Sequence, residues 1–228
     1  EEHGLSSVLL KKIDAIALDG IQQGAYPGCQ IVVLRNGHIM YDKAFGTYAG
    51  KGSPRVESTD IYDLASLSKT TGTLLAIMKL YDKGRFSLTD KISDYLPFLQ
   101  RTDKKDITIQ EILLHQSGLP SWIPFYQEVI DKDSYDGRLF SARRDAKHLL
   151  RIGTTTWANP DFKFKKEYIS SVGTGDYTVQ ICDSIWLNRS FRKVIEEKIA
   201  ETPLRQKRYV YSDIGFIPLG MLVEQLAE

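Results

Sequence analysis

The chain has few of the residues that mark metal sites, disulfide scaffolds or membrane spans. It contains two cysteines, Cys29 and Cys182, and both lie among apolar neighbours, so we expect buried free thiols and no disulfide. Its four histidines show no ligand spacing, so we expect no metal ion. We also expect no cofactor. No stretch approaches the ~20 consecutive apolar residues of a membrane-spanning helix.

An excess of one charge is also missing. The 30 Lys and Arg residues balance 29 Asp and Glu residues to a formal net charge of +1. This balance gives no reason to expect nucleic acid or an anionic membrane as a partner. The basic runs 163–166 and 205–208 are typical of solvated faces. A length of 228 residues with 42% hydrophobic content suits one sizeable globular domain.

The most informative segment that is present is Ser66-Leu67-Ser68-Lys69. On a helix, residues three positions apart share one face with ~5–6 Å between their Cβ atoms, so Lys69 could take the Ser66 proton without a histidine. Apolar periodicity followed by Gly84 predicts a helix over 69–83. Ser66 would then lie near a helix N-terminus, where N–H groups and the dipole favour a developing oxyanion.

Four segments, in order, resemble the serine β-lactamase and penicillin-binding-protein superfamily, in its class C and esterase-like branch. Residues 62–70 resemble its nucleophile segment and 28–39 its opening hairpin. Residues 107–119 resemble its helix and His-x-Ser-Gly-Leu loop, and 211–213 stand where the family has Tyr-x-Asn. More narrowly, the chain resembles the serine-hydrolase domains that Bacteroidetes fuse to, or encode beside, glycoside hydrolases of the β-N-acetylglucosaminidase type.

The resemblance implies an α+β fold, a helical subdomain plus an antiparallel sheet, in a single domain over 1–228. The family's third motif, Lys-Thr-Gly or His-x-Gly, does not occur between Tyr211 and Glu228. We therefore expect the C-terminal strands and the closing helix to be missing, and only the N-terminal hairpin of the sheet to be present. A lone hairpin is marginal in water, so a partner strand from a second copy, in a strand-swapped dimer, is one expectation.

The periodicity predicts a hairpin and several helices. The hairpin runs through 30–35 and 38–45 with Asn36-Gly37 as its turn. Further helices are expected at 5–24, 108–115, 191–200 and 214–227. The interval 118–190 is expected to be irregular, with a short helix at 144–152 and a role in a binding site.

The resemblance also implies the roles of three catalytic residues. Ser66 would be the nucleophile of an acyl-enzyme, Lys69 its base and Tyr211 a proton relay. The substrate would be a β-lactam, a D-alanyl peptide or a small ester, handled outside the cytoplasm in the periplasm or cell envelope. The alternative is an inert module of the same fold that binds cell-wall fragments or docks to a glycosidase partner.

Further candidates are expected to contact the substrate: Asp213, Trp122, Phe125 and Tyr126. Asp213 replaces the family's Asn, and a carboxylate close to Lys69 would weaken that base. Three interpretations of Asp213 remain: a helix N-cap that points away, a protonated side chain, or a damaged site. His115 is expected to be a structural histidine beneath a loop.

Overall fold

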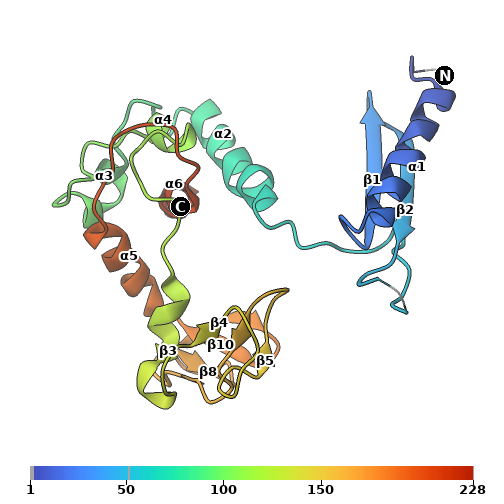
Figure 1. The fold of residues 1–228 in the computed structure, drawn as a ribbon. Helices are drawn as coiled ribbons and strands as arrows, with labels where there is room; N and C mark the ends of the chain where they lie inside the picture. Colours follow the sequence, from blue (N-terminus) through green and yellow to red (C-terminus); the bar gives the residue numbers. More distant parts are fainter. Residues whose placement is uncertain (1–2, 51, 228) are drawn as a thin grey trace. The chain divides into compact units, whose positions relative to one another are not determined.

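The computed structural model describes residues 3–50 and 52–227, and the chain divides into two compact units, Glu1–Ala65 and Ser66–Glu228. The first unit consists of α1 (Ser7–Gln22) beside an antiparallel hairpin of β1 (Gly28–Arg35) and β2 (His38–Gly46) (Figure 1). The predicted hairpin is therefore confirmed.

Local sequence explains this first unit. Asn36 and Gly37 have φ values of 50° and 78°, as the Asn-Gly turn requires. Helix α1 packs on β2, and the Tyr41 hydroxyl donates to Asp14 on the helix, which also pairs with Lys43 at 2.7 Å. Among the described residues, no third strand pairs with either strand of this hairpin.

The second unit gathers helices around one apolar core. Its helical elements are η1 (Lys69–Leu74), α2 (Leu75–Asp82), α3 (Ile92–Tyr95), η2 (Pro97–Leu99), α4 (Ile109–Leu113), η3 (Phe125–Val129), η4 (Lys132–Ser134), α5 (Phe191–Glu201) and α6 (Asp213–Ala227). The core residues with at most 2% exposure are Ile77, Ile92, Leu99, Ile107, Ile109, Ile112, Ile199, Ile214, Leu219 and Leu222. Each such side chain contributes about 1.5–3 kcal/mol by leaving water.

The helix predicted over 69–83 is confirmed, with a π-helical first part. It ends in a Schellman motif: the Gly84 N–H donates to the Tyr81 carbonyl at 2.8 Å and the Arg85 N–H to the Leu80 carbonyl at 3.0 Å. Gly84 has φ +66°, a left-handed conformation in which glycine carries no steric penalty.

The other helices that the sequence predicts outside the interval 118–190 also form. Their bounds agree with the expected ranges to within two residues: α1, α4, α5 and α6. Thr108 caps α4 through a capping box in which its hydroxyl accepts the Glu111 N–H while Glu111 accepts the Thr108 N–H. No described helix has the length and apolar character needed to cross a membrane.

The interval 118–190, which was expected to be irregular, contains short strands. The expectation that the N-terminal hairpin holds the only strands is therefore wrong. Short antiparallel sheets form in this interval, in the orders β3-β7, β4-β6-β5 and β8-β10-β9. Their strands are β3 (Ile130–Asp131), β4 (Phe140–Ser141), β5 (Leu150–Arg151), β6 (Trp157–Ala158), β7 (Lys163–Phe164), β8 (Ile169–Ser170), β9 (Tyr177–Cys182) and β10 (Ile185–Asn188). The two-residue strands β3 to β8 are too short to produce a readable alternation, whereas β9, with six residues, and β10, with four, were missed by the sequence analysis.

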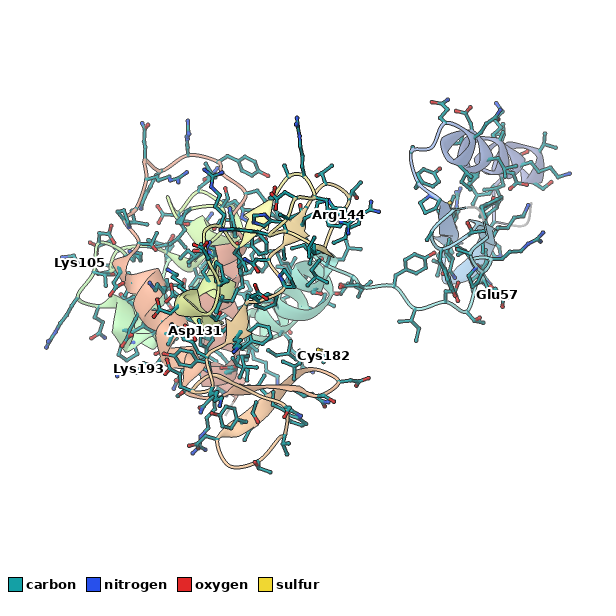
Figure 2. All side chains as sticks on the ribbon, turned by 60° about the horizontal axis from the view of Figure 1, so that its bottom comes forward. Glu57, Lys105, Asp131, Arg144, Cys182 and Lys193 are labelled. Carbon is teal, nitrogen blue, oxygen red and sulfur yellow. The ribbon has the colours of Figure 1, made fainter. Side chains whose placement is uncertain are left out.

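Two expectations within this interval are wrong. No helix forms over 144–152, because the Asp145 carboxylate accepts the N–H groups of Lys147 and His148, each at 2.9 Å, and holds a turn. Cys182 (Figure 2) is a free thiol but is exposed, because residues 178–182 of β9 are all exposed and neither face of this strand is covered. Cys29 is also free and is half-buried.

Candidate active site

Ser66 and Lys69 lie together at the start of the helical segment that carries η1 and α2. The Lys69 ammonium donates to Ser66 Oγ at 3.1 Å, and the Lys69 N–H donates to the Ser66 carbonyl at 3.1 Å. The turn before Ser66 is tight: Ala65 has φ +42°, and its N–H donates to the Asp63 carboxylate at 2.7 Å. The spacing therefore brings hydroxyl and amine into contact, as the sequence predicts.

Ser212 ties the start of α6 to the loop after α4. Its buried hydroxyl, 2% exposed, donates to the Pro120 carbonyl at 2.6 Å and accepts the Gly215 N–H at 3.2 Å. Its own N–H donates to His115 Nδ1 at 3.1 Å. Ser212 is thus the N-cap of α6 and fixes both neighbours, Tyr211 and Asp213.

Because Ser212 caps the helix, Asp213 does not, and the N-cap interpretation of Asp213 is wrong. The Asp213 carboxylate instead forms an ion pair with Lys69 at 2.6 Å, while its N–H donates to the Ser121 carbonyl at 2.8 Å. The side chain of Lys69 is 17% exposed and that of Asp213 is 52% exposed.

The ion pair determines the charge of the lysine. Its hydrogen bond with Asp213 raises the pKa of Lys69 above its ordinary value, against the opposing effect of burial. Lys69 is therefore an ammonium group at neutral pH. A cation 3.1 Å from Ser66 Oγ stabilises negative charge there but has no lone pair to accept the serine proton.

Tyr211 lies close to both Lys69 and Ser66. The Lys69 ammonium is 5.3 Å from the centre of the Tyr211 ring. Hydrogen bonding to Ser66 and to Lys69 lowers the pKa of Tyr211, so its phenolate is more accessible than that of an ordinary tyrosine. Tyr211 is thus the group whose pKa moves toward neutral pH beside the Ser66 hydroxyl.

His115 packs against Tyr211 and accepts a hydrogen bond from Ser212. Its ring centre is 4.6 Å from that of Tyr211, and burial together with the Lys69 charge lowers the pKa of His115. Since Nδ1 accepts the Ser212 N–H, the neutral ring carries its proton on Nε2. The expected structural role of His115 is consistent with this packing.

The three aromatic candidates occupy different environments. Trp122 is 59% exposed and directly follows Ser121, whose carbonyl holds Asp213. Phe125 packs against the main core and against a second apolar cluster around Val129, Ile130 and Phe191, so it joins the two. Tyr126 is also exposed, with its ring 5.9 Å from that of Phe140. The chain path thus connects Trp122 most directly to the catalytic candidates.

Sequence reasoning did not identify Ser212 or Gly118 as site-building residues. Gly118 has φ +83°, and an added Cβ would lie 2.5 Å from the Arg205 carbonyl oxygen. The Arg205 N–H donates to the Gly118 carbonyl at 2.9 Å, so the two segments touch through their backbones. Ser and Asp are both N-cap residues, and they stand side by side before the helix predicted over 214–227, so the sequence could have offered Ser212 as the cap as well as Asp213.

A family model described as Beta-lactamase matches residues 13–228. Protein flp of Staphylococcus aureus (strain NCTC 8325 / PS 47) is 32% identical over 181 residues, which cover 78% of this chain and 36% of that protein. The N-acetylmuramyl-L-alanine amidase of Bacillus subtilis (strain 168) is 26% identical over 234 residues, 97% of this chain and 42% of that protein. The chain thus spans less than half the length of these relatives.

The fold also agrees with solved structures. The β-lactamase/D-alanine carboxypeptidase of Pseudomonas syringae aligns with a TM-score of 0.59 at 17% identity, covering 97% of this chain and 45% of that one. At this identity the likeness concerns the fold alone, which is α+β and β-lactamase-like, as the sequence predicts.

Proposed function

This chain belongs to the Beta-lactamase family, and on that premise we propose that it carries the catalytic residues of a serine hydrolase that forms an acyl-enzyme on Ser66. One observation carries the proposal: Ser66 Oγ lies 3.1 Å from the Lys69 ammonium, beside a tyrosine of lowered pKa. A nucleophile within hydrogen-bond reach of groups that can take up its proton and stabilise its charge is the usual arrangement for covalent catalysis.

In the proposed reaction, Ser66 Oγ attacks the acyl carbon while its proton passes to the Tyr211 phenolate. The bond to the leaving group then breaks, and the leaving group takes that proton from Tyr211. Water attacks the acyl-enzyme, Tyr211 accepts the water proton, and Ser66 Oγ recovers it when the acid leaves. Tyr211 is protonated within each half-reaction, and the end of acylation and the end of deacylation each return the site to its starting protonation.

Lys69 acts differently in this scheme from the expectation drawn from the sequence. The raised pKa of Lys69 favours its ammonium form, so we assign the base role to Tyr211 and assign Lys69 to stabilising the Ser66 alkoxide and the Tyr211 phenolate. The Ser66 N–H, directly before the helical segment, would donate to the oxyanion. Removing one such donor costs about 2.7–4 kcal/mol in other hydrolases.

A second candidate function is favoured by the same ion pair. If Asp213 holds Lys69 and Ser66 in an unreactive arrangement, the chain would be an inert module that binds cell-wall fragments or docks to a glycosidase. This candidate predicts binding without covalent labelling of Ser66.

Intact-mass spectrometry of the full-length protein tests the choice between the two. After incubation with a fluorophosphonate and, separately, with a penicillin, we expect one adduct in the wild type and none in Ser66→Ala. Ser68→Ala is the matched control, because Ser68 is one position from Lys69 along the helix, and it should label normally. Wild-type protein that stays unlabelled, while its fold is intact, would favour the inert module.

The remaining proposals concern the substrate and the surroundings. We propose a small acyl substrate, with β-lactams and D-alanyl peptides as the other classes, and Trp122 and Tyr126 as contacts for its acyl group. An extracytoplasmic location, a glycoside hydrolase in the same polypeptide or operon and a strand-swapped dimer are proposals as well. We also propose that the chain belongs to a single domain in which further strands complete the sheet that β1 and β2 begin.

A further inference from the structure

We propose that Asp213 determines the charge of the substrate: the site accepts acyl groups that are neutral or cationic and disfavours those that carry a carboxylate. The inference rests on the proposed function and ranks its candidate substrates: an acyl group without a carboxylate reacts faster than an otherwise equal acyl group that carries one.

The position of Asp213 is fixed from both sides. Its backbone is the first residue of α6, capped by Ser212, and its N–H is bonded to Ser121. One carboxylate oxygen, Oδ1, contacts Lys69. Within the part of the chain that the structure describes, the other oxygen has no hydrogen-bond donor, and the side chain is half-exposed. Asp213 therefore offers a half-exposed acceptor on the same Lys69 ammonium that contacts Ser66 Oγ.

The charges around Asp213 do not favour an anionic acyl group. The Lys69 ammonium and the Asp213 carboxylate cancel, and His115 is kept neutral by burial and by the nearby Lys69 charge. When Tyr211 is ionised, Lys69, Asp213, His115 and Tyr211 together carry a net negative charge. An anionic acyl group that approaches Ser66 thus meets no uncompensated cation among Lys69, Asp213, His115 and Tyr211.

The size of the effect follows from Coulomb's law. At roughly 7 Å and an effective dielectric constant near 20, two unit charges discriminate by up to about 50-fold in an equilibrium or rate constant. Solvent and salt at a half-exposed carboxylate reduce this to about tenfold. A cationic or N–H-bearing acyl group gains by a comparable factor, because the unoccupied oxygen can accept its hydrogen bond.

A set of p-nitrophenyl esters that differ only at one end of the acyl group tests the inference. The butyrate ends in a methyl, the hemisuccinate in a carboxylate and the β-alanine ester in an ammonium. Using the full-length protein, we expect Asp213→Asn to raise kcat/KM for the hemisuccinate relative to the butyrate by about tenfold. The same change should lower the relative value for the β-alanine ester. Both shifts should shrink at high ionic strength.

Asp136→Asn is the matched control, since it removes the same charge from a Lys–Asp pair, that of Asp136 with Lys147, in another segment. It should leave all three ratios unchanged. If Asp213→Asn changes all three esters by one common factor, Asp213 acts only through Lys69, and the inference is overturned. If no ester is turned over in a Ser66-dependent manner, the proposed function itself fails, which is a different outcome.

Discussion

The ammonium of Lys69 and the carboxylate of Asp213 lie 2.6 Å apart, next to the serine that the sequence marks as the nucleophile. This contact raises the pKa of Lys69, so the lysine is a cation at neutral pH, and it gives that cation a counter-charge within the site. The ion pair affects the pKa values of both Lys69 and Tyr211, so its removal should change the pH dependence of hydrolysis.

The profile of kcat/KM against pH should move to lower pH in Asp213→Asn. In the proposed reaction, activity should rise as Tyr211 ionises and fall as Lys69 loses its proton. Without the carboxylate, Lys69 loses the main cause of its raised pKa, so the alkaline limb moves down. Tyr211 loses the negative charge that opposes its ionisation, so the acid limb also moves down. Hydrolysis of a neutral ester across the neutral and alkaline range measures both limbs.

Ser212→Ala should destabilise the protein by about 1–3 kcal/mol, because it leaves a buried carbonyl and a helix N-terminus without their hydroxyl partner. Urea unfolding measures this change. Ser190→Ala provides the comparison: Ser190 precedes α5 but its side chain makes no capping bond, so the loss there should stay below about 0.5 kcal/mol. Equal losses of stability in the two variants would contradict a stabilising role of the Ser212 hydroxyl bonds to Pro120 and Gly215.

Gly118→Ala should cost more than Gly137→Ala, although both glycines have a left-handed φ, +83° and +81°. At Gly137 a Cβ meets open space, and only the backbone penalty of about 1–2 kcal/mol applies. At Gly118 it also meets the Arg205 carbonyl at 2.5 Å, which adds about 1–3 kcal/mol. The difference in unfolding free energy isolates the contact, and a zero difference would refute it.

Trp122→Ala and Phe125→Ala should separate substrate contact from packing. Trp122 is exposed, so its loss should raise KM for an aromatic ester several-fold and leave stability within about 0.5 kcal/mol of wild type. Phe125 joins two apolar clusters, so its loss should cost about 3 kcal/mol or more in urea unfolding. An unchanged KM in Trp122→Ala would remove it from the acyl-contacting residues.

The parts of this molecule that sequence reasoning identified are those in which local rules act alone. The Ser66–Lys69 spacing needs only a helix, the Asn36-Gly37 turn needs only its two residues, and Thr108 with Glu111 is a local capping box. Each of these features is formed by residues at most a few positions apart, and propensity and periodicity describe such distances well.

The parts that the sequence could not settle depend on contacts between distant residues. Whether Asp213 points to Lys69 or caps its own helix is decided by Ser212, whose hydroxyl takes the cap while bonded to Pro120. The exposure of Cys182 depends on whether other elements cover the two faces of β9, which its apolar sequence neighbours do not reveal.

The Ser212–Pro120 bond joins residues 92 positions apart, and together with its neighbouring bonds it closes the intervening chain into a large loop whose two ends meet at the site. The entropy of closing such a loop grows only with the logarithm of its length, so doubling it costs only about 0.6 kcal/mol. Insertions and deletions in the small sheets between β3 and β10 therefore place little demand on the residues that hold Tyr211 and Asp213. In evolution, the segment from β3 to β10 can change in length and in its exposed side chains while Tyr211 and Asp213 keep their positions.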